Sequence, residues 1–350
     1  MQRNLGLDIL RTFSIFLVLF QHGGITIQKM VVPTMGAFGV EIFFVLSGFL
    51  IGDILIRQLQ KENSLKSIKT FLIRRWLRIL PTYYFILLFK FLFIDHSVGF
   101  NIIYYFLFLQ NNFYGIQFHD VTWSLVIEEW FYIFLPLFLT LFFKLNGKKF
   151  KTGMLFFIAF ILAEIILRFI YVQFKGGTYS AINGIFLLRF DALFMGVILA
   201  YLKNNYFELF KKLNSFWLSS LACGLIIAYL FYINNRVGAS ENFNNSTVLK
   251  VSHFIILPFL ISLIVPKIFF SSIDWMGIKF KTCLTFCFTN LSKLTYALYL
   301  VHPFFYFVID YFNPAYSKLL YFIFTFASAF LLYNLIEKPI LKLRDKKIKE

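Results

Sequence analysis

Cysteine and acidic residues are scarce in this sequence, and each scarcity excludes classes of protein. The three cysteines, Cys223, Cys283 and Cys287, lie in or beside apolar segments and form no C-x-x-C pair, so neither a disulfide framework nor a zinc site is indicated. The chain has 17 acidic residues against 34 lysines and arginines, which gives a net charge of +17. Because these basic residues lie in short connections between apolar stretches, they indicate membrane orientation and not nucleic-acid binding.

Apolar residues, in contrast, are abundant along the whole chain. Hydrophobic residues make up 59% of it and aromatic residues 21%, including 51 phenylalanines. This composition predicts an all-α, polytopic integral membrane protein. No cleavable signal peptide is expected, because the first apolar stretch is too long and contains Arg11. About ten transmembrane helices are predicted, at residues 5–27, 36–56, 79–94, 123–143, 153–172, 183–201, 216–233, 251–270, 294–312 and 317–336.

The distribution of basic residues predicts how the chain crosses the membrane. The connection from Arg57 to Arg78 holds seven basic residues and one acid, and is therefore placed in the cytoplasm. Residues 99–118 are predicted to be re-entrant or to lie flat on the outer face, because the basic turn from Lys144 to Lys151 then also lies inside. Both termini are expected in the cytoplasm. We expect a single transmembrane domain over residues 1–350, with no soluble C-terminal domain.

The first apolar stretch carries ionisable residues at membrane depth, where such groups are costly and usually face a polar cavity or a partner. Arg11 and His22 are separated by close to three helical turns, so they share one helix face and lie about 16 Å apart along it. Asp8 falls on the same face. One helix would therefore present a cation near its inner end and an imidazole near its outer end. The alternative is a structural Arg–Asp pair and a structural, hydrogen-bonded histidine.

Two adjacent carboxylates open a later apolar stretch, which reads W-S-L-V-I-E-E from Trp123. Ser124 and Glu128 are four residues apart and share a helix face, whereas Glu129 is turned by about 100°. Packing does not readily explain two neighbouring acids in a membrane span. We therefore take Ser124, Glu128 and Glu129 as candidates for chemistry and Trp123 as a candidate substrate contact.

Further polar residues are expected in the other spans. Glu41 begins the second stretch, Arg189 and Asp191 lie in L-R-F-D-A-L, and His302 precedes a proline. We take these four residues as candidates for substrate binding. The alternatives are a structural ion pair for Arg189 and a structural role for His302 beside a helix-kinking proline.

A basic cluster, R-R-W-L-R, lies directly before the predicted third span and contains Arg74, Arg75 and Arg78. One interpretation is a set of snorkelling side chains that touch anionic lipid headgroups. The other is a phosphate clamp, because the guanidinium fork matches phosphate oxygens in a bidentate manner. The cluster by itself does not separate the two.

Several segments resemble those of the membrane-bound acyltransferase family 3, which includes bacterial O-acetyltransferases of lipopolysaccharide, Nod factor and other surface glycans. They run along the whole chain and read LDILRTFSIFLVLFQH, GVEIFFVLSGFLI, RRWLRILPTYY, WSLVIEEWFY, RFDALFMG, SKLTYALYLVHPF and IEKPILK. Each segment is a weak signal by itself, but their order and spacing together are specific.

The resemblance implies an acyltransferase of the bacterial inner (cytoplasmic) membrane. Its donor would be an acyl-CoA, usually acetyl-CoA, in the cytoplasm, and its acceptor a hydroxyl of a surface or lipid-linked glycan outside. No metal is implied. The resemblance assigns Arg11 and His22 to the active site, with His22 as the main catalytic candidate. It also implies that Arg74, Arg75 and Arg78 bind CoA.

These assignments give a predicted reaction. The CoA phosphates bind the cluster from Arg74 to Arg78, and the pantetheine arm passes Arg11. His22 then removes the proton of the acceptor hydroxyl, with Glu128 as its carboxylate partner.

Other side chains are expected to assist. Glu129 has a secondary role, and Ser124 or Arg189 supports the developing oxyanion. Direct transfer and a covalent intermediate, on His22 or Ser47, both stay open.

Two other functions fit the same sequence. A transporter or flippase for a lipid-linked sugar or an organic acid would use polar residues at membrane depth but would not need a His–carboxylate pair. A sensor or assembly scaffold has no obvious use for the charged stripe. For the acyltransferase, the outer segments 100–122 and 234–250 are expected to select the acceptor.

Overall fold

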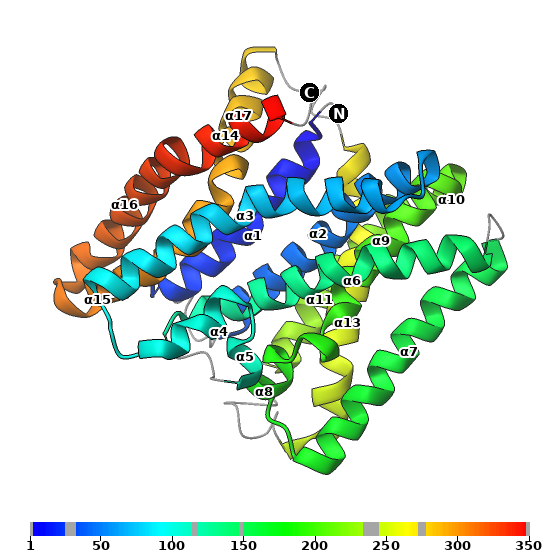
Figure 1. Cartoon of the computed structure of the whole chain (residues 1–350), viewed down its shortest axis with the longest axis horizontal. Coiled ribbons are helices and arrows are strands. Elements are labelled where there is room, and N and C mark those ends of the chain that lie inside the picture. Colours follow the sequence, from blue (N-terminus) through cyan, green and yellow to red (C-terminus); the bar gives the residue numbers. More distant parts are fainter. Residues whose placement is uncertain are drawn as a thin grey trace.

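Figure 1 shows the computed structural model, which describes residues 3–24, 33–113, 118–146, 150–233, 245–271 and 278–347. In these ranges the regular elements are helices, which confirms the predicted all-α class. The longer ones are α1 (Leu5–His22), α2 (Pro33–Lys61), α3 (Leu65–Phe93), α6 (Trp123–Asn146), α7 (Phe150–Lys175), α9 (Phe190–Asn205), α11 (Phe216–Tyr232), α13 (Thr247–Phe270), α14 (Ile278–Val301) and α16 (Pro314–Leu332). The shorter ones are η1 (Gly99–Asn101), α4 (Ile102–Phe106), α5 (Gln110–Phe113), η2 (Asp120–Thr122), α8 (Tyr179–Gly184), η3 (Phe186–Leu188), α10 (Phe207–Lys212), η5 (His302–Phe305), α15 (Tyr306–Tyr311), the π-helical η6 (Tyr333–Glu337) and α17 (Lys338–Lys347).

The number of helices that can cross a membrane is the main test of the predicted topology. Seven of the described helical segments are long and apolar enough to do so, which makes the chain a multi-pass membrane protein. They contain α1, α2, α3, α6, α7, α13 and α16. Helices α9, α11 and α14 overlap the remaining predicted spans but are not among the seven. The total of ten spans and the cytoplasmic position of both termini therefore stay predictions.

Several predicted span boundaries are wrong, including the start of α14 at Ile278 instead of residue 294, and three of the errors move a candidate residue. Helix α3 begins at Leu65, where the Ser64 side chain accepts a hydrogen bond from the backbone of Ser67, so the basic cluster lies inside the helix and not before it. The many charges of this segment obscured its helical pattern. Helix α14 ends at Val301, because Pro303 lacks the N–H that would continue it, and His302 begins a 3₁₀ turn. Helix α9 begins only at Phe190, so Arg189 precedes it.

Residues 99–113, the described part of the stretch predicted to stay out of the membrane interior, form η1, α4 and α5. None of these elements has membrane length, as expected. The hydroxyl groups of Tyr83 and Tyr84 on α3 donate hydrogen bonds to the backbone carbonyls of Tyr105 and Phe106. This segment is thereby fixed against the end of α3, just before η2 leads into α6.

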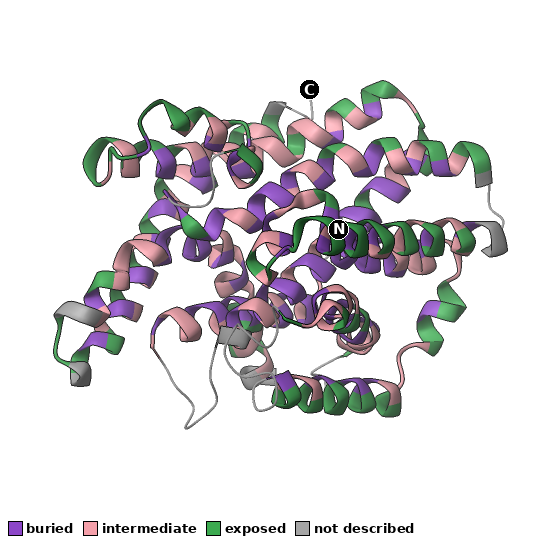
Figure 2. Cartoon of the chain, turned by 90° about the horizontal axis from the view of Figure 1, so that it is seen from below, coloured by how far each residue is buried: buried purple, intermediate pink, exposed green. Residues whose placement is uncertain are grey.

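Helix α2 occupies the centre of the bundle and packs closely on α9. A Cβ atom at Gly48 would lie 1.9 Å from the carbonyl oxygen of Leu193, and one at Gly196 would lie 2.0 Å from that of Val45, so both helices need glycine at this crossing. Figure 2 shows that buried residues fill the interior of the bundle, while α7 and α16 lie at opposite edges in Figure 1.

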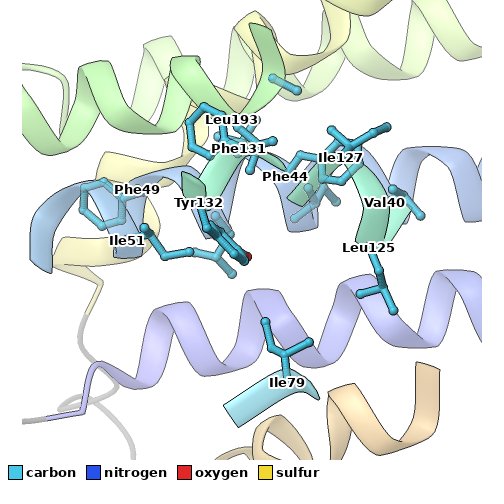
Figure 3. Packing of buried hydrophobic residues seen from close by; sticks show 14 of the residues in the cluster. Val40, Phe44, Phe49, Ile51, Ile79, Leu125, Ile127, Phe131, Tyr132 and Leu193 are labelled. Carbon is cyan, nitrogen blue, oxygen red and sulfur yellow. The ribbon is translucent and has the colours of Figure 1, made fainter. Parts of the chain in front are cut away.

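The hydrophobic core lies where α2, α6 and α9 meet. Figure 3 shows Phe44 and Phe49 of α2, Phe131 of α6 and Leu193 of α9 in this cluster. The Phe131 ring also makes edge contacts with two phenylalanines of α9. The core thus holds in place the two helices, α2 and α6, that supply much of the polar site described next.

Candidate active site

Described residues of the bundle line two cavities that contain charged side chains. The first, here called the arginine cavity, has a volume of about 200 Å³, and its charged lining residues are Arg11, Arg75, Arg78 and Glu128. The second, here called the histidine cavity, has a volume of about 270 Å³ and is lined by His22, Asp120, Val121, Trp123, Ser180, Asn183 and Gly184. Helix α1 therefore presents Arg11 to one cavity and His22 to the other, as the spacing in the sequence predicted.

Arg75 and Arg78 enter the arginine cavity from the same face of α3, because they are three residues apart. Arg75 donates a hydrogen bond to the hydroxyl of Tyr132 and lies 3.6 Å from a carboxylate oxygen of Glu128. The Tyr132 hydroxyl in turn donates to Glu128 over 2.5 Å and accepts from Ser47 over 2.9 Å. One carboxylate thus faces several guanidinium groups, which leaves the cavity with an excess of positive charge.

Arg11 is only loosely paired in this cavity. Its guanidinium lies 3.9 Å from Asp8. The carboxylate of Asp8 is held instead by Arg3 at 2.6 Å and by the hydroxyl of Ser292 at 2.7 Å. The structural Arg11–Asp8 pair considered from the sequence is therefore weak, and Arg11 adds to the positive charge available to an anion.

Arg74, the third residue of the predicted clamp, does not share this environment. Its side chain is exposed and is not part of the cavity lining, while its backbone carbonyl accepts a hydrogen bond from Arg344. The basic cluster is therefore divided, because α3 turns Arg75 and Arg78 inward and Arg74 outward.

The histidine cavity gathers groups that can handle a proton. The His22 ring stacks on Tyr306 at 5.1 Å and lies 5.2 Å from the ring of His302. His302 is buried and donates from Nδ1 to the backbone carbonyl of Tyr299 over 2.8 Å, while its Nε2 has no hydrogen-bond partner among the described residues. Asp120 supplies a carboxylate to the same cavity as His22.

His119, which precedes Asp120 in the sequence, differs from His22 in its environment. It is buried outside the spanning helices, and this burial, together with the nearby Lys90, lowers its pKa to about 3. It therefore stays neutral and is a weak base at physiological pH. Its ring contacts Phe304 at 5.6 Å, which indicates a packing role.

A small hydrogen-bonded group separates the two cavities. Ser124 donates to the hydroxyl of Tyr299 over 2.6 Å, and Tyr299 donates to the backbone carbonyl of Val121 over 2.8 Å. Ser124 and Tyr299 line the arginine cavity, whereas Val121 lines the histidine cavity. Beside them, the Trp123 ring of the histidine cavity meets the Phe44 ring of the arginine cavity edge-on at 6.1 Å.

The two predicted catalytic carboxylates lie away from His22. Glu128 is bonded to Tyr132 and paired with Arg75 in the arginine cavity. Glu129 is buried outside both cavity linings, and neither of its oxygens has a hydrogen-bond partner in the described part of the chain. The predicted pairing of Glu128 with His22 therefore has no support from the geometry, and Asp120 is the carboxylate that lines the same cavity as His22.

Three of the residues predicted to bind substrate lie in a buried ion-pair network. Arg189 is hydrogen-bonded to Glu41 and lies 3.8 Å from Asp191, which also pairs with Arg168 at 2.5 Å. None of these residues lines either cavity, and the placement favours a structural role. Trp123, in contrast, lines the histidine cavity, and His302 lies next to His22.

Several polar residues of the site were missed from the sequence. Asp120 and Tyr132 could have been found, since one precedes the W-S-L-V-I-E-E segment by three residues and the other follows Glu128 by four. Tyr299, Ser180 and Asn183 carry no such signal, because only the folded chain brings them to the cavities.

Comparison of the sequence with known proteins identifies the family of this chain. A family model described as an acyltransferase domain matches residues 4–336. A Staphylococcus aureus protein named "Putative O-acetyltransferase" is 29% identical over 255 residues, which is 66% of this chain and 41% of that protein. The peptidoglycan O-acetyltransferase OatA of Listeria monocytogenes is 33% identical over 162 residues, 39% of this chain and 24% of OatA. A Haemophilus influenzae protein of unstated function is 33% identical over 223 residues, 57% of this chain and 89% of its own length.

No solved structure matches the chain. This chain spans about two fifths of the Staphylococcus relatives, 41% of their length. The fold and the paired cavities define a multi-pass helical membrane protein with a polar site inside its bundle. Since the family model covers most of the sequence, the chain belongs to the membrane-bound acyltransferase family 3.

Proposed function

We propose that this protein is an O-acyltransferase that moves an acyl group, in the simplest case acetyl, from acyl-CoA to a hydroxyl of a glycan. The observation that carries the proposal is the position of the positively charged arginine cavity directly beside the histidine cavity. One cavity suits the phosphates of a donor, and the other suits removal of a proton from an acceptor. The names of the relatives support acetyl transfer and, in one case, a glycan acceptor.

The donor binds first to the arginine cavity in this scheme. Arg75 and Arg78 hold phosphate oxygens of CoA from the cytoplasmic side, and the pantetheine arm passes Arg11. The thioester then lies at the boundary formed by Ser124 and Tyr299. The Ser124 hydroxyl can exchange its hydrogen bond to Tyr299 for one to the thioester oxygen as negative charge develops on that oxygen.

His22 acts on the acceptor. It takes the proton of the acceptor hydroxyl as the oxygen attacks the thioester carbon, so a C–O bond forms while the C–S bond breaks. The CoA thiolate leaves and receives the proton from the His22 imidazolium. Asp120 replaces Glu128 as the carboxylate that favours the imidazolium, since it shares the cavity with His22. The whole reaction converts acyl-CoA and an alcohol to an ester and CoA.

The site also sets the expected location of each substrate. We place the arginine cavity toward the cytoplasm and the histidine cavity toward the outer face of a bacterial cytoplasmic membrane. Acceptors would be surface or lipid-linked glycans, among which lipopolysaccharide and peptidoglycan are candidates. The predicted acceptor segment 234–250 lies mostly outside the described residues.

The test is transfer of radiolabelled acetyl from acetyl-CoA to glycan in membrane vesicles. We compare wild type with His22→Ala and with His96→Ala, whose histidine is exposed and lines neither cavity. Label should appear with wild type and His96→Ala and should be lost in an equally expressed His22→Ala variant. Transfer by His22→Ala at the wild-type rate would move the base elsewhere. No transfer by wild type across a panel of acceptors and acyl-CoAs would favour the transporter or flippase.

A further inference from the structure

The wall of the histidine cavity formed by α8 has no assigned role so far. Ser180, Asn183 and Gly184 all line the cavity that contains His22. Ser180 and Asn183 are three residues apart, so they lie on one face of this short helix. The side chain of Thr178 caps it by accepting a hydrogen bond from the backbone of Ala181.

This wall is tied to the start of α6. The side-chain amide of Asn111 donates to the carbonyl of Gly184 over 2.7 Å and to the carbonyl of Trp123 over 3.1 Å. One amide group therefore fixes α8 and Trp123 relative to each other. The two segments therefore form one preorganised binding surface before a ligand binds.

The polar atoms of the wall point to a ligand that carries hydroxyl groups. The side-chain oxygen of Asn183 is buried and has no donor among the described residues. A buried acceptor without a donor is costly, so a ligand hydroxyl that donates to this oxygen, once the Asn183 amide turns it toward the cavity, would bind favourably. Ser180 is exposed and offers both a donor and an acceptor.

The other residues that line the histidine cavity indicate the chemical class of its ligand. Among the described residues that line the cavity there is no lysine or arginine and Asp120 is the acidic member, which disfavours an anionic group. The indole of Trp123 offers a flat apolar face and an N–H. The volume of about 270 Å³ is slightly below the ~300–1,000 Å³ of typical small-molecule pockets, so it suits one ring and not a longer chain.

We propose that Trp123, Ser180 and Asn183 bind a neutral sugar ring of the acceptor and direct one of its hydroxyl groups toward His22. This inference rests on the proposed acyl transfer for its role but not for its binding. The ring lies against the indole of Trp123, and its hydroxyl groups bond to Ser180 and Asn183. The rest of the glycan leaves through the exposed edge at Asp120 and Ser180.

Steady-state kinetics test the role of the wall. Ser180→Ala and Asn183→Ala should each raise the KM for the acceptor about five- to tenfold, as expected for one lost hydrogen bond, while the KM for acetyl-CoA stays within about twofold. Asn63→Ala is the matched control, because Asn63 is exposed, lies outside the segments expected to select the acceptor and lines neither cavity. An unchanged acceptor KM in both wall variants would overturn the proposal.

Binding without transfer separates this proposal from the proposed function. Wild type in lipid nanodiscs is applied to an array of neutral, N-acetylated and acidic oligosaccharides, together with Asn183→Ala, Trp123→Ala and Asn63→Ala. Neutral sugars should be retained by wild type and Asn63→Ala, and lost by the other two. If wild type retains no sugar, or if all variants retain sugars equally, the site is wrong. Sugar binding that depends on Asn183 in a protein that transfers no acetyl would uphold the site and reject the acyltransferase.

Discussion

The hydroxyl groups of Ser124 and Tyr299 lie 2.6 Å apart at the boundary between the arginine cavity and the histidine cavity. Tyr299 also donates to the backbone carbonyl of Val121, in the turn that leads from Asp120 to Trp123. One hydroxyl thus fixes both the edge of the donor cavity and the segment that carries the acceptor groups. In the proposed reaction, the acyl group passes from donor to acceptor at this boundary.

Replacing Tyr299 by phenylalanine tests the boundary. The ring is kept, but Ser124 and the Val121 carbonyl lose their partner, so we expect kcat to fall about tenfold and the free energy of unfolding to fall by about 1 kcal/mol. The KM for acetyl-CoA should not change, because the phosphate-binding arginines are untouched. Kinetics and thermal unfolding in detergent measure both effects, with the exposed Tyr316→Phe as control. An unchanged kcat for Tyr299→Phe would show that the boundary has no part in transfer.

The division of the basic cluster provides a sharp test of donor binding. Arg75→Ala and Arg78→Ala should each raise the KM for acetyl-CoA about tenfold or more, because each removes a charge-assisted contact with phosphate. Arg74 belongs to the same motif, but its side chain is exposed and does not line the cavity. The KM for acetyl-CoA of Arg74→Ala should therefore stay within about twofold of wild type. Initial rates over a range of acetyl-CoA concentrations give the KM of each variant. An equal effect of all three substitutions would favour the lipid-headgroup interpretation.

The carboxylate partner of His22 can be identified by a pair of neutral replacements. Asp120→Asn should lower kcat about ten- to hundredfold without changing the KM for either substrate, since the carboxylate favours the imidazolium that forms during transfer. Glu128→Gln should act mainly on the KM for acetyl-CoA, because Glu128 pairs with Arg75. Asp95→Asn, outside both cavity linings, is the control. A loss of kcat in Glu128→Gln but not in Asp120→Asn would restore the partner expected from the sequence.

The sequence predicted the fold class and the face shared by Arg11 and His22, because both follow from local properties. Hydrophobic content identifies membrane helices, and the helical period places residues on a face whatever the tertiary structure. These predictions needed no knowledge of which helices are neighbours.

The partners of charged residues could not be predicted in this way. Glu128 and Asp120 both lie near Trp123 in the sequence, but helix α6 turns Glu128 toward α3, whereas η2 leaves Asp120 beside the end of α1. Which carboxylate meets His22 depends on how three helices pack. The same reason explains why α8 was overlooked, since its two polar residues belong to no motif and gain their role from the neighbouring cavity.

The buried ion-pair network around Arg189 can be either structural or part of substrate binding, and substitutions distinguish the two roles. Arg189→Met leaves Glu41 buried without its partner and should lower the free energy of unfolding by about 3 kcal/mol or more. The double variant Arg189→Met/Glu41→Leu should be more stable than Arg189→Met, because it removes the unpaired charge as well. Arg57 is 39% exposed and pairs with Asp53, so Arg57→Met should lower the free energy of unfolding by at most about 1 kcal/mol.

Thermal unfolding in detergent, combined with the acceptor KM of the folded fraction, distinguishes the two roles. A structural network predicts a lower Tm with an unchanged acceptor KM in Arg189→Met, because the network lines neither cavity. A wild-type Tm with a raised acceptor KM would mean that Arg189 contacts the substrate, as the sequence suggested. The expected result would assign the intramembrane charges to two separate tasks, with Arg189 holding the helices together and Arg75 binding the donor.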